Sequence, residues 1–182
     1  MNQKTIDYLK RRTAELAIGS STLRNQGAAG VAKTTRQFLA NLDLKFFSVN
    51  SVQEFNKILD RSTKNLIRVL PEGARNWGTA RKALNIFLRD CVYNQFLSSH
   101  FVISRIHPWL EIPLDSHVAS GLRATSYKKN LPRWVSIKRL KREDSGKYQD
   151  MAAKVADKME CNRVDLDIYL WRQLGIREIQ NV

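Results

Sequence analysis

Apolar residues recur every three or four positions along most of this chain, which is the spacing of an amphipathic helix. Near the N-terminus they form one stripe that predicts a first helix: Ile6, Leu9, Thr13, Leu16 and Ala17. After a glycine-rich loop the pattern returns from Val31 to Leu42. Ser51 and Glu54 then have the spacing of a capping box, which predicts the start of another helix. A further short helix is expected from about Thr63 to Leu70.

The clearest pattern predicts a long helix from about Thr79 to Ser98. Its apolar positions keep a 3.6-residue rhythm: Ala80, Leu84, Phe87, Leu88, Cys91, Val92 and Phe96. Lys82, Asn85 and Arg89 occupy the opposite face. This helix is therefore expected to bury one side and to present polar groups on the other.

The second half of the chain is less regular. Residues 107–115 contain two prolines and are expected to be irregular. Residues 143–146 have the composition of a linker, and two closing helices with apolar inner faces are expected after it. Residues 45–49 and 113–115 could supply short strands, but neither would form a sheet. The chain is therefore predicted to be all-α, with about eight helices.

The charge balance predicts the kind of partner that the protein binds. The 182 residues include 31 Lys and Arg against 17 Asp and Glu, a net charge of +14. Such an excess usually serves binding to a polyanion, here DNA or RNA. A merely basic protein is the alternative. No apolar run approaches the roughly 20 residues of a membrane span, so a membrane partner is not expected.

Part of the positive charge is concentrated in residues 128–142, which we call the basic segment. The basic residues of this segment include Lys128, Lys129, Arg133, Lys138 and Arg139, with Trp134 among them. The segment could neutralise phosphates, or it could be an ordinary solvated charge run. Its position suggests two lobes around a basic cleft within a single helical domain. One lobe would comprise residues 20–98, and the other residues 1–19 with 99–182.

Cysteine usage and the N-terminus bound the chemistry. Cys91 and Cys161 are far apart, lie in apolar helical patterns and are expected to be free thiols. No cluster with metal-ligand spacing occurs, so neither a metal nor another cofactor is expected. The N-terminus lacks the apolar core of a secretory signal, which predicts an intracellular, cytoplasmic protein.

A possible phosphate site lies at the start of the long helix. The glycine of Gly78-Thr-Ala80 opens this helix, where free backbone amides and the helix dipole favour an anion. Arg75 and Arg81 add positive charge. An ordinary helix start with a solvated basic first turn is the alternative reading.

Two motifs in this region resemble a known family. The first is LPEGARNWGTARKALN, and the second, downstream, is IPLDSHVASGL. In this order they resemble the helix-hairpin-helix DNA glycosylases, in particular the endonuclease III-like branch with its LPGVGRKTAN hairpin and its VDTHV segment. The closing YLWRQLG is similar to the last helix of that branch. The hairpin here is longer, and no cysteine quartet follows, so the iron–sulfur cluster of that branch is not implied.

The resemblance places the catalytic aspartate of the family at Asp115. A carboxylate close to the sugar C1′ would stabilise the positive charge that builds up when an N-glycosidic bond breaks, or would activate a nucleophile. Taken without the resemblance, Asp115 reads as the N-cap of a helix that begins after it. The two roles are compatible. His117, two positions on, is expected to orient the local backbone.

The resemblance also gives roles to other residues. Lys82 matches the lysine that attacks C1′ in the bifunctional branch, although an exposed lysine usually binds phosphate or solvent. Asn25 and Gln26 would form a wedge that fills the gap left by a flipped base, or else a polar turn. Trp77 could stack on a base or pack in the core.

The resemblance implies a DNA glycosylase that binds double-stranded DNA and excises a damaged or modified base with Asp115, and we expect it to be a monomer. Lys82 could add strand cleavage at the abasic site. Genome repair is the family's usual role, and defence against modified phage DNA is an open alternative. A non-catalytic helix-hairpin-helix DNA-binding protein, and an RNA-binding or complex-assembly protein, remain the competing hypotheses.

Overall fold

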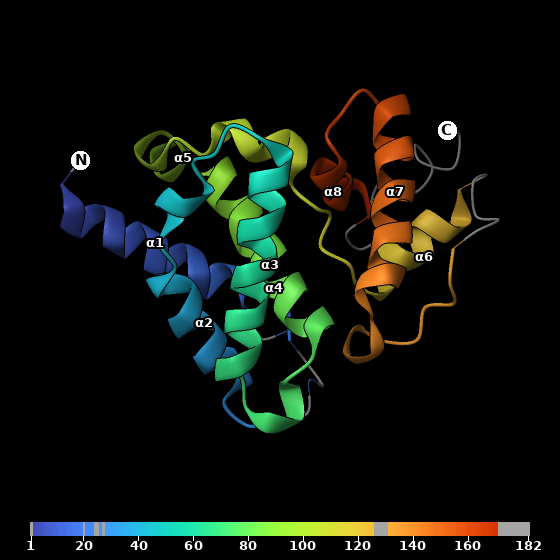
Figure 1. The fold of residues 1–182 in the computed structure, drawn as a ribbon, viewed down its shortest axis with the longest axis horizontal. Helices are drawn as coiled ribbons and strands as arrows, with labels where there is room; N and C mark the ends of the chain where they lie inside the picture. The colour runs from blue at the N-terminus through green and yellow to red at the C-terminus, as the bar shows by residue number, and fades with distance from the viewer. Residues whose placement is uncertain (1, 20, 24–25, 27, 126–130, 171–182) are drawn as a thin grey trace.

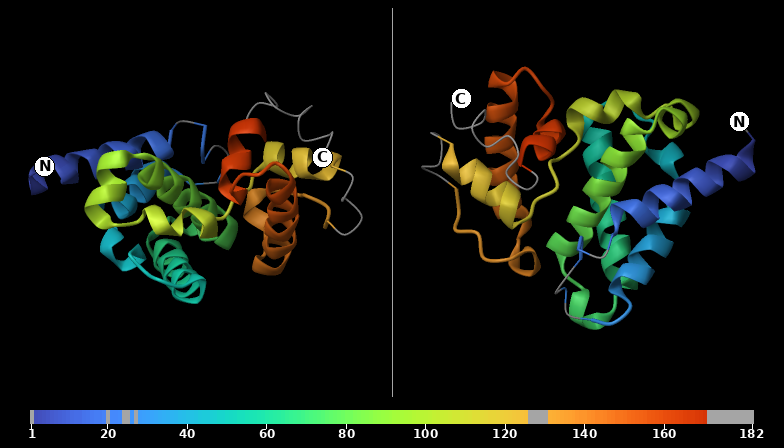
Figure 2. Two further views of the ribbon diagram at one scale, coloured as in Figure 1. Left: turned by 90° about the horizontal axis from the view of Figure 1, so that it is seen from above. Right: turned by 180° about the vertical axis from the view of Figure 1, so that it is seen from behind.

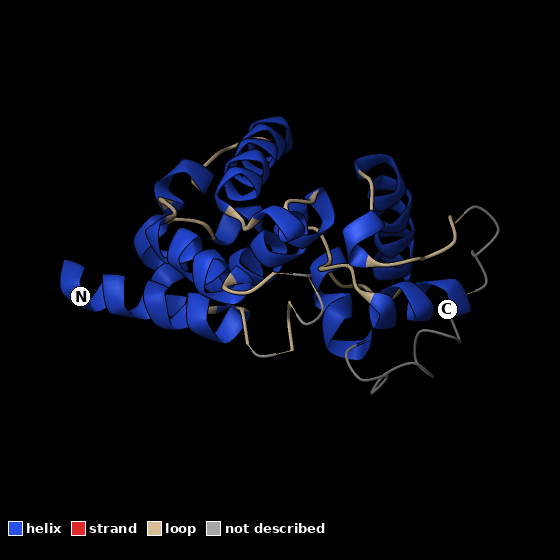
Figure 3. Cartoon of the chain, turned by 90° about the horizontal axis from the view of Figure 1, so that it is seen from below, coloured by secondary structure: helices blue, strands red, loops and turns tan. Residues whose placement is uncertain are grey.

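The computed structural model describes residues 2–19, 21–23, 26, 28–125 and 131–170. Helices and loops account for all of these residues, and no strand occurs among them (Figure 3). The α-helices are α1 (Gln3–Ala17), α2 (Val31–Asn41), α3 (Val52–Val69), α4 (Trp77–Tyr93), α5 (Gln95–Phe101), α6 (Ser116–Ala124), α7 (Arg142–Lys158) and α8 (Leu166–Leu170). The 3-10 segments are η1 (Leu44–Phe47), η2 (Glu72–Ala74), η3 (Ser104–Trp109), η5 (Ile137–Arg139) and η6 (Arg163–Asp165). The predicted all-α class is therefore confirmed.

Two groups of buried apolar side chains hold the helices together. The N-terminal cluster runs from Ile6 to Leu110 and is joined by Val164. It packs α1, α2 and α3 around α4, whose Leu84, Phe87 and Leu88 are fully buried (Figure 1). The long apolar stripe of α4 makes this helix the centre of the cluster.

The C-terminal cluster runs from Ile112 to Leu170 and packs α6 and α8 against α7 (Figure 2). Gly121 of α6 lies against α8 so closely that a Cβ there would be 2.2 Å from a methyl of Leu170. Only glycine fits this crossing without repacking.

Residues 110–112 connect the two clusters and are held by side chains of the C-terminal half. Gln149 of α7 accepts from the Ile112 amide at 3.0 Å and donates to the Ile112 carbonyl at 2.9 Å. Arg163 donates to the carbonyls of Leu110 and Trp109 at 3.1 and 2.9 Å. These bonds satisfy backbone groups that no helix pairs between η3 and α6.

Three element boundaries differ from the sequence prediction. The helices expected to start at Ser51 and Thr63 are one helix, α3, because Ser62 and Thr63 are buried and the Thr63 hydroxyl donates to the Leu59 carbonyl at 2.7 Å. The expected helix to Ser98 divides at Asn94, whose side chain caps α5.

The third difference is at residues 143–146, which were expected to be a linker and instead form the first turn of α7. Glu143 and Asp144 stabilise that turn, because negative charge is favourable at the positive end of a helix. The two apolar clusters also do not follow the residue ranges expected for the two lobes, since α1 packs in the N-terminal cluster with α2 and α4. The change of cluster falls at residues 110–112, not near residue 98.

Candidate active site

The helix α4 begins where the glycine motif predicts a helix start. Asn76 is the N-cap, and its side chain accepts from the Thr79 amide at 2.9 Å. Lys82 follows this N-cap by six residues, between one and two turns into α4. Lys82 thus sits on a rigid element whose other faces are buried in the N-terminal cluster.

Lys82 and Asp115 meet in the structure. The Lys82 Nζ lies 3.2 Å from Asp115 Oδ2, although 33 positions separate the two residues in the sequence. The exposed fractions of their side chains are 12% and 28%, so the pair is partly desolvated yet reachable from solvent. The two residues that the family resemblance names as catalytic therefore form one site.

Asp115 also caps α6, as the alternative reading predicts. Its Oδ1 accepts from the backbone amides of His117 and Val118 at 2.9 and 3.0 Å. The two carboxylate oxygens are thus divided, with Oδ1 fixed by the helix and Oδ2 directed at Lys82. The His117 side chain is exposed, and it is the backbone of this residue that holds the aspartate.

A second carboxylate, Asp167 of α8, lies near this pair and was not found from the sequence. Burial raises its pKa to about 6; Arg89 and Lys82 oppose the rise, and the negative charge of Asp115 adds to it. Asp167 forms an ion pair with Arg89, which also pairs with Asp90. An aspartate inside the apolar stretch Val164–Leu170 is the signal that could have identified it.

Further along the α4 face that carries Lys82 and Arg89, Tyr93 belongs to another cluster of polar side chains. Asp165 accepts from the Tyr93 hydroxyl at 2.5 Å and lies 2.8 Å from His107 Nε2. Burial opposes ionisation of Asp165, but the hydrogen bonds of Tyr93 and His107 outweigh burial and lower its pKa. The sequence offered no partner for His107; the structure gives it this one.

Arg81, predicted to contact DNA, has its guanidinium inside the protein. It donates to Glu111 through two nitrogens at 2.8 and 2.7 Å, and to Asp60 at 3.0 Å. Asn85 donates to the same Glu111 at 2.9 Å. Burial opposes ionisation of Glu111, but the Arg81 hydrogen bonds outweigh it and lower its pKa. At Arg81 and Asn85, the polar side chains of α4 therefore form a network inside the protein and do not face solvent.

The hairpin residues are also more enclosed than expected. Gly78 packs against the basic segment, where a Cβ on Gly78 would be 2.0 Å from the Ile137 carbonyl oxygen. Ala80 is fully buried. Arg75 is exposed, and its Nε donates to the Leu70 carbonyl at 2.8 Å, at the end of α3. The close approach at Gly78 supplies a packing reason for the glycine, independent of phosphate.

The remaining residues expected to contact DNA belong to the N-terminal loop and to the basic segment. Gln26 is buried, and its Oε1 accepts from the Thr79 hydroxyl at 2.7 Å, which puts it beside the first turn of α4. Arg133, Lys138 and Arg139 are exposed, and η5 brings the last two next to α4. The expectations for Asn25, Lys128 and Lys129 lie outside the described residues.

The two tryptophans of these motifs are half-buried. Trp134 meets Tyr148 edge to face, with ring centroids 5.7 Å apart. Trp77 carries the Arg81 guanidinium over its ring at 5.4 Å from the centroid. Trp77 also lines a cavity of about 570 Å³, together with Trp109, Glu111 and Arg142. Lys82 and Asp115 do not line this cavity.

The described residues include no group of three or more His, Cys, Asp or Glu side chains that could hold a metal ion. Within the same ranges, every helix falls short of the length or apolar character that a bilayer crossing requires. A scan of protein-family models and searches of curated proteins and of solved structures found no match to this chain.

Proposed function

We propose that this protein is a DNA glycosylase of the helix-hairpin-helix type, with Asp115 and Lys82 as its catalytic residues. It binds double-stranded DNA, flips one nucleotide out of the duplex and cleaves the N-glycosidic bond of that nucleotide. The α3–α4 hairpin and the two apolar clusters correspond in this proposal to the hairpin and the two lobes that the sequence motifs imply.

The observation that carries the proposal is the 3.2 Å contact between Lys82 Nζ and Asp115 Oδ2. The two residues belong to separate motifs, 33 positions apart in the sequence. Their meeting is what a shared active site requires, because a nucleophile and a carboxylate must both reach one sugar carbon.

The proposed chemistry follows from the different partners of the two Asp115 carboxylate oxygens. Oδ1 is fixed by two amides of α6, so Oδ2 has a defined direction. As the bond to the base breaks, Oδ2 stabilises the positive charge on the deoxyribose. In the bifunctional variant of the reaction, the Lys82 ammonium first transfers a proton to Asp115 Oδ2. The free amine attacks C1′ as the base leaves with its bonding electron pair and takes a proton from the attacking nitrogen. The proton on Asp115 then passes to O4′ as the C1′–O4′ bond opens, which gives the protonated Schiff base.

The surroundings of the pair suit a DNA backbone. Arg133, Lys138 and Arg139 are exposed on the segment that packs against the start of α4. Gln26 lies beside Thr79, one turn from Lys82 on the same helix, which suits a loop that supports the duplex near the flipped base. Arg81 is left out of the proposed contacts, because Glu111 and Asp60 already satisfy its guanidinium.

Mass spectrometry of free bases tests the proposal directly. The wild-type protein is incubated with a panel of damaged and naturally modified duplex DNAs, beside Asp115→Asn, Lys82→Gln and the control Asp7→Asn. Asp7 is an exposed aspartate of α1. We expect base release by the wild type and the control, and loss of at least about a hundredfold in Asp115→Asn. Release at an undiminished rate by Asp115→Asn contradicts the site assignment.

Borohydride trapping separates the two modes of Lys82. A covalent protein–DNA adduct in the wild type that is absent in Lys82→Gln shows the Schiff base. Base release without an adduct assigns the reaction to water and leaves Lys82 as a positioning cation.

A non-catalytic DNA-binding protein is the second candidate. It is favoured by the fact that both Asp115 oxygens already have structural partners, the α6 amides and Lys82. This candidate predicts salt-sensitive duplex binding with no base released from any DNA of the panel.

A further inference from the structure

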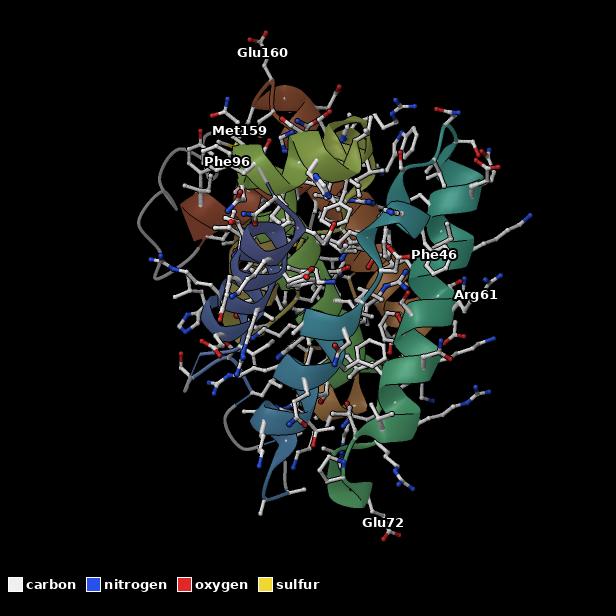
Figure 4. The ribbon with its side chains drawn as sticks, turned by 90° about the vertical axis from the view of Figure 1, so that its left-hand side faces the viewer. Phe46, Arg61, Glu72, Phe96, Met159 and Glu160 are labelled. Carbon is white, nitrogen blue, oxygen red and sulfur yellow. The ribbon has the colours of Figure 1, made fainter. Side chains whose placement is uncertain are left out.

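A groove on the outer side of the N-terminal cluster lies between α2, η1 and α3. Its volume is about 530 Å³, and its apolar lining includes Phe38, Phe46, Ile58 and Val69. Arg61 lines it as well, and Figure 4 shows Phe46 and Arg61 next to each other at the surface. None of the residues of the candidate active site lines this groove.

Phe46 is presented to solvent on a fixed support. The neighbouring Leu44 and Phe47 of η1 are fully buried, and Asp43 caps the segment by accepting from the Lys45 amide at 3.0 Å. The Phe46 ring is 62% exposed. A single exposed apolar residue is ordinary, but a rigidly held aromatic ring at the edge of a groove offers a stacking surface.

A row of positive charge follows the same groove. The exposed basic residues of α3 recur at the spacing of one helix face: Lys57, Arg61, Lys64 and Arg68. Among the described residues, none of the four takes part in an ion pair. From residue 31 to residue 69 the chain has seven Lys and Arg against three Asp and Glu, a difference of +4.

We propose that this groove binds single-stranded DNA, with a base stacked on Phe46 and the phosphates along the α3 row. Stacking on an aromatic ring beside a positive track is how proteins bind single strands without reading their sequence. The side chains of Gln37, Asn41 and Asn65 in the lining can contact base edges. An amphipathic peptide helix suits the groove less well, because these amides interrupt its apolar floor. The proposal does not depend on glycosylase activity.

Fluorescence anisotropy with a labelled oligothymidylate of 15 nucleotides tests this groove. The variants are Phe46→Ala and the triple variant Arg61→Gln, Lys64→Gln, Arg68→Gln. Phe96→Ala is the control for the aromatic change, since Phe96 is 57% exposed on α5. The triple control Arg12→Gln, Lys147→Gln, Lys154→Gln removes the same charge from exposed positions elsewhere. Circular dichroism confirms that each variant is folded.

We expect Phe46→Ala and the groove triple variant each to raise the Kd by about tenfold or more. The two controls should change it by less than about threefold. Equal losses in both triple variants, or no loss in Phe46→Ala, would show non-specific charge binding and overturn the proposal. Two other outcomes also overturn it: Phe46-dependent binding of an acidic helical peptide without binding of the oligonucleotide, and a dimer that Phe46→Ala dissociates.

Discussion

Arg81 and Lys82 are neighbours on α4, but their positive charges meet different surroundings. The Arg81 side chain is 6% exposed, and two carboxylates and a hydroxyl take up its donors. Lys82 has one carboxylate at 3.2 Å, and that carboxylate is 28% exposed. A buried cation whose three nitrogens all donate to protein groups is committed to the fold, whereas a partly open pair retains the freedom to bind or react. The sequence alone presents both as basic residues of one motif.

Replacing Arg81 should have the largest effect on stability. In Arg81→Met, Glu111 stays buried and loses the two hydrogen bonds that keep it ionised. Breaking a buried ion pair on one side costs about 3–5 kcal/mol of unfolding free energy. Urea denaturation measures this loss. A decrease below about 1 kcal/mol would mean that the network is not structural.

The pH dependence of stability should reveal Asp167, which pairs with Arg89 and lies near Lys82 and Asp115. Burial raises its pKa to about 6 from an ordinary value of 3.8, so the native state keeps a proton that the unfolded state has lost. This group therefore stabilises the fold below about pH 4, and the contribution is lost as the pH rises through about 6. Relative to wild type, Asp167→Asn should gain up to about 3 kcal/mol of unfolding free energy between pH 4 and pH 7.

Urea curves of the wild type and Asp167→Asn at the two pH values measure this gain, with Asp7→Asn as the control for an exposed aspartate. Unfolding free energies that change in parallel for all three proteins would remove Asp167 from the titrating groups.

Replacing Lys82 should have the smallest effect on stability. Lys82→Met is the matched control for Arg81→Met, one position along the same helix. Because water reaches Asp115, its carboxylate stays hydrated when the partner is removed, and the unfolding free energy should fall by about 1 kcal/mol or less. A loss as large as that of Arg81→Met would show that both pairs serve the fold, and the contrast between the two residues would disappear.

The helices of the N-terminal cluster could be predicted because their apolar spacing is set by the helix itself. The limits of α1 and α2 follow this spacing closely. The continuity of α3 through Ser62 could not, because it depends on which side chains the rest of the fold buries. The division at Asn94 comes from a local cap, which the continuous apolar spacing of this stretch conceals. The first turn of α7 could not be predicted from its composition, because charged residues beside a glycine are also typical of linkers.

Part of the candidate site could be predicted, since the motifs name Lys82 and Asp115 in advance and the structure brings them together. The role of Arg81 could not, because its partners Asp60 and Glu111 are 21 and 30 positions away. Asp167 was missed for the same reason. Short-range patterns give the position of a side chain on its helix, and only the packed chain gives its partners.

The side chains of Gln149 and Arg163 have a consequence for how the molecule moves. Four hydrogen bonds from these side chains hold the backbone of residues 109–112, which includes the stretch that connects the two apolar clusters. The two Gln149 bonds lie within the C-terminal half. The two Arg163 bonds tie Trp109 and Leu110, which pack in the N-terminal cluster, to η6, so they resist movement of the connection relative to η6. In the proposed function, a nucleic acid would therefore meet a connection that η6 already holds in place, and we expect the nucleic acid rather than this connection to deform on binding.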